Sequence, residues 1–378
     1  MKGDLAATPP GVTRHAPHVR QAADLRWIMN RMTLALVPCL LIGLWNTGLQ
    51  ANLAMQALGA EKIPGWRGAL LEALGIGGDS ASPWDSLWLG LLYFLPVYAV
   101  AAVTVRLWET VFARLRRREL MPGGMVTALI YALILPPAAP LWQVALGISF
   151  AVVIGKEIFG GTGKNFVNPA ALGLAFLSLS YPNEMAGDPI WTGIAGYGGT
   201  LAFNSAAAAG MDAVVRSGVT WTDSFLGFVQ GAPGETSALA CLLGASVLIV
   251  AGIASWRIMA GVVIGGVASA LLFNTLGGAL GGEAAPIFTV PWYWHVTLGS
   301  FAFGAVFLAT DPASAAATDP GRWVYGLLIG FMIVLIRVAN PTHPDGVIVA
   351  ILLGNIFAPL IDHAVMRVNI AKRARRCV

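Results

Sequence analysis

The chain has 378 residues, of which 57% are hydrophobic and 11% are charged, and its formal net charge is +4. A mean hydropathy of +0.71 is too high for a water-soluble domain of this length, so the composition indicates an all-α polytopic membrane protein. Lys and Arg gather beside apolar segments rather than on one basic face, and this distribution argues against nucleic acid as a partner.

Cysteine usage and the N-terminus set two further limits. Cys39, Cys241 and Cys377 show no CxxC or Cys/His spacing, so this chain alone supports neither an iron–sulfur cluster nor a disulfide framework. We expect each to be a packing residue or an incidental thiol, although a partner chain could still donate ligands. Residues 1–32 are polar and lack the apolar core of a cleavable signal.

Hydropathy divides the chain into five parts: a cytoplasmic N-terminal arm (1–32), a first membrane half (33–181), an outer-side connection (182–235), a second membrane half (236–363) and a basic cytoplasmic tail (364–378). We expect residues 25–32 of the arm to form a helix lying at the membrane surface. The halves contain ten expected spans, at about 33–48, 86–105, 123–136, 141–158, 169–181, 236–254, 258–276, 292–310, 323–339 and 346–363.

Orientation follows from the basic residues in the loops. Lys62, Arg67 and Arg216 fall on one side, Arg337 falls inside the ninth span, and all the remaining Lys and Arg lie on the side of both termini. Positive loops stay in the cytoplasm, so both termini and the Gly160–Asn168 turn are predicted to be cytoplasmic, with residues 182–235 outside.

Five spans precede the long outer connection and five follow it, which is typical of inverted-repeat membrane folds with a cavity between the halves. Each half also contains a span that begins with small residues, at Gly123–Ala128 and Gly234–Ala240. The alternative is that these small residues only allow helices to pack closely.

The Gly160–Asn168 turn runs directly into the apolar fifth span, with Pro169 in the first helical turn. Lys164, Asn165 and Asn168 therefore lie at a helix start, where free N–H groups and a positive dipole end favour a phosphate, a carboxylate or the carbonyl edge of a flavin or quinone. A re-entrant turn whose glycines serve packing alone is an equally weighted alternative.

Ionisable residues near the membrane are the remaining candidates. Lys156 and Glu157 are helix neighbours that do not face each other, so each needs another partner. Glu235 either caps the sixth span or collects a cation from outside. Asp362 is the acidic residue of the tenth span, and its depth differs from that of Arg337, so we do not expect the two to pair.

The two Asp-Pro pairs within residues 311–320 are expected to cap helices or make turns. His295, His343 and His363 are isolated in the sequence, and we expect them to be interfacial. The residues show no Ser/His/Asp, His-cluster or P-loop pattern.

Several longer motifs resemble those of the B component of the sodium-translocating NADH:quinone oxidoreductase family, with the D component of the Rnf complex as a more distant relative. The resemblance covers nearly the whole chain. The motifs are Ala16–Arg20, Lys156–Pro169, Pro233–Ala240, Ala309–Asp319 and Asn355–Asp362 with the basic tail.

The resemblance implies a fold of ten helices related to urea transporters, within a respiratory pump that has flavodehydrogenase, iron–sulfur and small membrane subunits. It implies riboflavin or another non-covalent flavin at the turn that contains Asn165 and Asn168, with Thr162, Gly163 and Lys164 beside them. It also implies a ubiquinone site near Gly123 and the N-terminal arm.

One family motif is altered. The family attaches FMN to a threonine in an Asp-x-x-Ser-Gly-Ala-Thr type sequence, and a gap-free match puts Ala195, Gly198 and Leu201 at its aspartate, serine and threonine. Leu201 has no hydroxyl, so we expect covalent FMN to be absent, with Thr200 as the one alternative acceptor.

These observations favour a redox subunit in a bacterial inner membrane that couples electron transfer to Na+ or proton transport, with Glu235 and Asp362 as ion-pathway candidates. Two alternatives stay open: a non-redox scaffold subunit of such a complex, and a stand-alone urea-transporter-like channel.

Overall fold

The computed structural model describes residues 24–60, 63, 66–73, 75, 82–185, 188–194, 202–280, 285–340 and 346–375. Every regular element within these ranges is helical, which confirms the all-α class. Five helices are long and apolar enough to cross a membrane: α1 (Leu25–Leu58), α3 (Pro83–Leu115), α13 (Trp256–Leu280), α16 (Asp319–Ala339) and α17 (Val347–Ala374).

Shorter helices fill the space between the long ones. The apolar ones are α4 (Gly124–Ile134), α5 (Leu141–Val152), α6 (Pro169–Ser180) and α12 (Ala238–Val250). The connection at residues 182–235 contributes α7 (Pro182–Met185), α8 (Asp188–Thr192), α9 (Ala202–Ala209), α10 (Met211–Arg216) and α11 (Trp221–Leu226). The rest are α2 (Trp66–Ala73), the 3₁₀ helix η3 (Pro286–Thr289), α14 (Trp292–Thr297) and α15 (Phe301–Phe303).

The first helix is longer than the sequence predicted. Residues 25–32 continue into the first span as one helix, so the prediction of a separate surface helix there was wrong. Asp24 precedes the helix and accepts a hydrogen bond from the N–H of Leu25, and Gly59 ends it in the left-handed conformation. At about 1.5 Å per residue, α1 is some 50 Å long and exceeds the bilayer core.

Two expected spans are interrupted by π-helical turns. The fourth consists of α5 followed by η1 (Val153–Glu157), and the eighth consists of α14, α15 and η4 (Gly304–Leu308). A π turn widens the helix and frees backbone groups, and such turns are common at functional sites. Here each one leads into a polar segment, residues 158–168 after η1 and residues 309–318 after η4.

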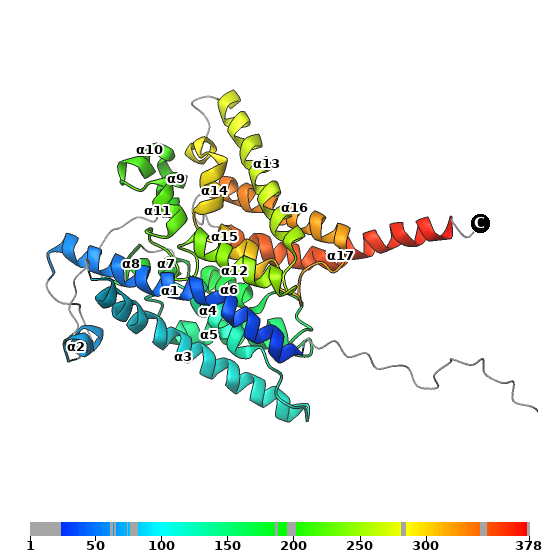
Figure 1. The fold of residues 1–378 in the computed structure, drawn as a ribbon, viewed down its shortest axis with the longest axis horizontal. Helices are drawn as coiled ribbons and strands as arrows, with labels where there is room; N and C mark the ends of the chain where they lie inside the picture. Colours follow the sequence, from blue (N-terminus) through cyan, green and yellow to red (C-terminus); the bar gives the residue numbers. More distant parts are fainter. Residues whose placement is uncertain are drawn as a thin grey trace, which may run out of the picture.

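Glycines let the long helices pack in close pairs. A Cβ on Gly90 of α3 would lie 1.8 Å from the carbonyl oxygen of Leu44, and one on Gly330 of α16 would lie 2.1 Å from that of Val262. α1 therefore lies directly against α3, and α13 against α16 (Figure 1).

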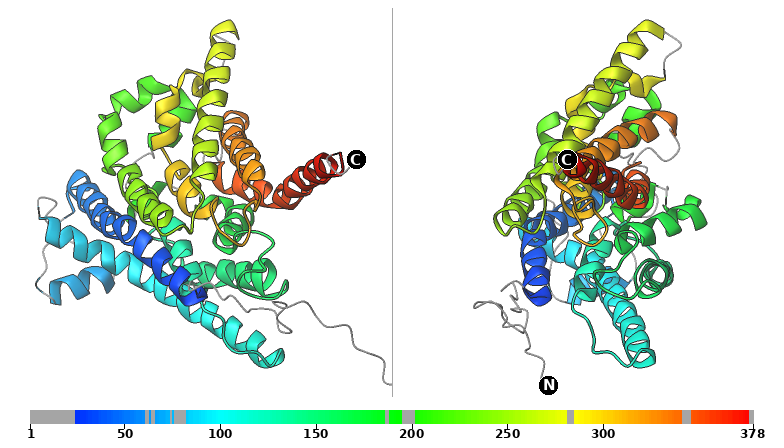
Figure 2. Two further views of the ribbon diagram at one scale, coloured as in Figure 1. Left: turned by 45° about the vertical axis from the view of Figure 1, so that its right-hand side comes forward. Right: turned by 90° about the vertical axis from the view of Figure 1, so that its right-hand side faces the viewer.

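The helices of the first membrane half and those of the second lie largely on different sides of the molecule. The helices up to α5 occupy the lower part of Figure 1, and α13, α14 and α16 occupy the upper part. Contacts between α1 and α12 and between α6 and α17 connect them. The C-terminal end of α17 extends away from the other helices in Figure 1 and in the left view of Figure 2, and its residues from Met366 onward are exposed.

Candidate functional site

The segment between η1 and α6 contains the predicted flavin residues. Asn168 is 4% exposed, and its Oδ1 accepts a hydrogen bond from the N–H of Ala171 at 3.2 Å. It is the N-cap of α6, and Pro169 occupies the first turn as the sequence predicted. One of the two candidate asparagines thus has a structural role already.

Two other polar atoms of this segment are buried without a partner. Thr162 Oγ1 and Asn165 Oδ1 make no hydrogen bond within the described structure. Such an atom costs roughly 1–3 kcal/mol when nothing satisfies it. Lys164 and Gly163 are exposed, and a Cβ built on Gly163 would have no atom within 4 Å. The turn therefore combines unsatisfied buried groups with open space beside them.

The predicted quinone residue lies next to this turn. A Cβ on Gly123 would lie 3.0 Å from Cγ2 of Thr162 and 3.3 Å from Sδ of Met29. The N-terminal end of α1, the start of α4 and the turn thus meet at one place. The structure brings together residues that the sequence assigned to two ligands.

A buried ion pair supports the base of the turn. Lys156 Nζ lies 2.6 Å from Oε1 of Glu109, and both side chains are buried. Arg116 pairs with Glu157 at 3.6 Å and also donates to its carbonyl oxygen. The sequence indicated that Lys156 and Glu157 needed partners but did not identify Glu109, because 47 residues separate Glu109 from Lys156.

A pocket opens beside these pairs. Its lining includes Glu109, Arg116, Glu157, Gly160 and Gly161. Charged groups of both signs thus lie at its wall, next to the glycines that begin the turn.

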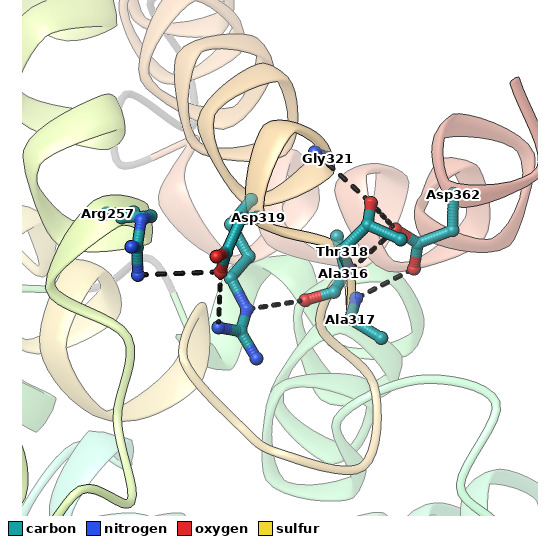
Figure 3. A network of polar contacts seen from close by, with 8 residues as sticks. Arg257, Ala316, Ala317, Thr318, Asp319, Gly321 and Asp362 are labelled. Carbon is teal, nitrogen blue, oxygen red and sulfur yellow. Dashed lines mark hydrogen bonds and ion pairs between the residues drawn. The ribbon is translucent and has the colours of Figure 1, made fainter. Parts of the chain in front are cut away.

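The polar groups of the segment after η4 form hydrogen bonds with one another and with Asp362. Asp311 accepts hydrogen bonds from the N–H of Ala313 at 3.2 Å and from the hydroxyl of Ser314 at 3.1 Å. Asp362 of α17 accepts from the N–H groups of Ala317 at 2.7 Å and Thr318 at 3.0 Å, and also from the Thr318 hydroxyl (Figure 3). These donors already surround the Asp362 carboxylate, so the geometry favours a role in positioning this loop.

Asp319 completes the network on the other side of the loop. Its carboxylate contacts Arg257 at 3.4 Å and Arg322 at 3.1 Å (Figure 3). Thr318 is the N-cap of α16 and accepts from the N–H of Gly321 at 3.2 Å. Asp311 makes a turn as expected, whereas the cap of α16 is Thr318 and Asp319 forms ion pairs instead.

Glu235 lies in a turn before α12, but the N-cap of that helix is Ser237, whose hydroxyl accepts from the N–H of Ala240 at 3.2 Å. The capping alternative for Glu235 was therefore wrong. The preceding segment is attached to α1, because Asn46 donates to the carbonyl of Val229 at 2.7 Å and Gln50 to that of Phe228 at 3.1 Å.

Arg337 is fully buried in α16. Its guanidinium donates to the carbonyl oxygens of His295 at 2.6 Å and Leu298 at 2.9 Å, at the C-terminal end of α14. A cation at this end of a helix is favourably placed. His295 is 2% exposed and is therefore buried inside the protein. As expected, Arg337 and Asp362 have separate partners.

Thr200 and the rest of the altered flavin-attachment sequence, residues 195–201, lie outside the described residues. His343 lies outside them too.

Comparison with known proteins identifies the family. The profile of the NQR2, RnfD, RnfE family matches residues 12–371, which covers almost the entire chain. The chain belongs to this family. A relative from Azotobacter vinelandii, named as the B component of Na(+)-translocating NADH-quinone reductase, is 50% identical over 374 residues, covering 98% of this chain and 91% of its own length.

Two further relatives in the NQR2, RnfD, RnfE family have the same name. The one from Pseudomonas paraeruginosa is 50% identical over 372 residues, covering 97% of this chain and 91% of its own. The one from Chromohalobacter salexigens is 51% identical over 369 residues, covering 98% of this chain and 88% of its own. The resemblance stated from the motifs is therefore confirmed along the chain.

Proposed function

We propose that this chain is the membrane subunit of an ion-translocating NADH:quinone oxidoreductase complex, in which it carries a flavin, a quinone or both and couples electron transfer to the transport of Na+ or protons. Relatives of nearly equal length, about half identical, are named as the B component of Na(+)-translocating NADH-quinone reductase. The observation that carries the cofactor part is the pair of unsatisfied buried atoms at Thr162 and Asn165.

These residues fit a flavin. Asn165 Oδ1 would accept from a ring N–H, the Thr162 hydroxyl would donate to or accept from the polar edge, and Lys164 would supply positive charge near a reduced ring. A bound flavin supplies one- and two-electron transfer. The chain's own contribution is to orient the ring, with Asn168 fixing the start of α6 beneath it. The quinone would bind near Gly123, where the start of α4 contacts Thr162 and Met29.

We propose that this flavin is riboflavin or another non-covalently bound flavin. Leu201 occupies the position where the family's attachment threonine would lie, and it cannot form a phosphoester. Thr200 is the one neighbouring acceptor, and an intact peptide spanning residues 191–216 with the mass of an attached FMN would contradict this assignment.

For the architecture, we propose ten spans in two inverted repeats of five helices, related to urea transporters. The order of the long and short helices is compatible with this arrangement. Both termini would lie in the cytoplasm of a bacterium, the chain in its inner membrane and residues 182–235 outside, because the positive loops cluster with the termini. Flavodehydrogenase, iron–sulfur and small membrane subunits would be the partners.

For the ion pathway we retain Glu235 and Asp362 as candidates. Glu235 lies in the segment attached to α1, and Asp362 fixes the loop that also contains Asp311. Glu235→Gln and Asp362→Asn are expected to change the dependence of quinone reduction on Na+ concentration. Unchanged dependence in both variants would remove them.

The decisive experiment is to purify the complex from its own membranes, denature it and record flavin fluorescence in the protein band of this chain and in the released supernatant. We expect released flavin, and about one equivalent less of it in Asn165→Ala. The matched control is Asn369→Ala, at an exposed position of α17, which should leave the flavin content unchanged. Fluorescence in the band would indicate covalent attachment, and a band without fluorescence together with equal released flavin in Asn165→Ala and the unaltered complex would favour the scaffold or channel alternative.

A further inference from the structure

Two cysteines far apart in the sequence meet inside the membrane body. Cys39 of α1 and Cys241 of α12 are 202 residues apart, and their Sγ atoms lie 3.8 Å from each other. Their exposed fractions are 1% and 0%. Both cysteines are thus packing residues, and the sequence did not indicate that they meet.

The pair lies at a close contact between the two membrane halves. One turn along α12, a Cβ on Gly244 would lie 2.5 Å from the carbonyl oxygen of Ala35 on α1. One turn along α1, a Cβ on Gly43 would lie 1.8 Å from that of Pro233. The sulfur of Cys241 also lies 3.8 Å from the carbonyl oxygen of Gly234. The thiols are therefore positioned by both helices, and Cys241 also contacts the turn that precedes α12.

We propose that Cys39 and Cys241 form a binding site for a soft monovalent cation of the copper group, Cu+ or Ag+. Thiolate sulfur selects such ions over hard cations. With metal–sulfur bonds of roughly 2.3 Å, a linear sulfur–metal–sulfur unit needs sulfurs roughly 4.6 Å apart, so the pair would separate by less than about 1 Å. A disulfide at about 2.05 Å would require a larger approach of two closely packed helices.

Charge balance also selects the ion. When M+ binds, one thiol loses its proton to water and becomes a thiolate, while the second thiol coordinates through a lone pair and keeps its proton. The site then remains neutral, as a low-dielectric interior requires. Zn2+ prefers four ligands, and among the described residues no group of three or more Cys, His, Asp or Glu is placed to hold a metal.

The consequence is a metal-dependent link between the halves. A bound ion would join α1 to α12 and oppose relative motion of the two halves. Access is expected through the segment at residues 228–237, which the side chains of Asn46 and Gln50 attach to α1.

The test uses the full-length chain, purified in detergent, reduced with dithiothreitol, desalted and loaded with Ag+ alone. All variants carry Cys377→Ala, which removes the third thiol. After a wash with excess glutathione, a monothiol competitor, we expect the Cys377→Ala chain to retain one Ag+ by mass spectrometry. Chains that also carry Cys39→Ala or Cys241→Ala should retain none, because a single thiol loses the ion to glutathione.

Two further readouts make the result decisive. Loading in weak buffer should release one proton per Ag+, and Zn2+ should not be retained. If an alanine variant does not give a monodisperse gel-filtration peak, the serine variant, which is closer in volume, replaces it. Equal Ag+ retention with one or two of these cysteines, no retention by the Cys377→Ala chain, or release of two protons would overturn the proposal.

Discussion

The two polar segments that follow the π turns are built alike, but they differ in whether protein groups satisfy their polar side chains. Each leads from a widened helix to a capped helix start with proline in its first turn: Asn168 and Pro169 begin α6, and Thr318 and Pro320 begin α16. In the segment after η4, protein donors satisfy Asp311 and Asp362. In the segment after η1, Thr162 and Asn165 retain unsatisfied atoms. The comparison separates a loop closed by the protein itself from one that has room for a ligand.

The largest expected loss of stability comes from breaking the Lys156–Glu109 ion pair next to the Gly160–Asn168 turn. Lys156→Met leaves the Glu109 carboxylate buried at 6% exposure without its partner. Breaking a buried pair in this way costs about 3–5 kcal/mol, so the Tm in detergent should fall sharply. The double variant Lys156→Met/Glu109→Leu is the control and should recover most of the loss. Equal Tm values for the single variant and the wild type would show that the pair does not support the turn.

Asp362→Asn tests the closed loop. The amide keeps one acceptor oxygen but loses the charge that strengthens the hydrogen bonds from Ala317 and Thr318. We expect a loss of about 1.5–3 kcal/mol, the worth of hydrogen bonds to a charged group, and faster hydrogen exchange at residues 313–321. Asp24→Asn, at the exposed start of α1, is the matched control. Unchanged exchange in this loop would contradict the positioning role.

The two asparagines of the open turn should behave differently. Asn168→Ala removes the N-cap of α6 and should cost about 1 kcal/mol even without a ligand. Asn165→Ala removes an unpaired atom and should change the stability of the flavin-free chain by less than about 0.5 kcal/mol, while lowering flavin content. Thermal melts of flavin-free and flavin-loaded samples separate these outcomes. Equal losses of stability for Asn168→Ala and Asn165→Ala in the flavin-free state would contradict the different roles given to the two asparagines.

The smallest effect is expected at the N-terminal cap of α11, whose hydrogen bonds are all made within the protein. Thr220 and Asp223 form a capping box at α11, and hydrogen bonds from the Thr220 hydroxyl and N–H lower the pKa of the exposed Asp223. A lowered pKa adds stability above the ordinary value of about 3.9 and loses it as pH falls through the folded-state value. Exchange protection at residues 221–226 should therefore decrease in acid. Asp223→Asn should flatten this pH dependence, and an unchanged profile would remove the cap as its cause.

Much of the local structure was predictable because its signals are local. Asn168 and Pro169 indicated a helix start, and α6 begins there with Asn168 as its N-cap. The family could be predicted because long motifs such as Lys156–Pro169 are specific.

The rest depends on contacts between distant residues. Glu109 meets Lys156, Cys39 meets Cys241 and Asp362 meets Thr318 through packing that no spacing rule encodes. The two π turns were missed because they interrupt otherwise continuous apolar patterns.

The carbonyl contacts of Arg337 bear on how the protein is inserted into the membrane. An arginine within a span adds up to about 2.5–3.5 kcal/mol to the cost of insertion, which the apolar residues of α16 must offset if that helix enters alone. Arg337 donates its hydrogen bonds to carbonyl oxygens of His295 in α14 and of Leu298 directly after α14. Both residues precede α16 in the chain. Insertion of α16 is therefore cheaper if α14 is already in place, so the order of synthesis favours assembly of these two segments as one unit.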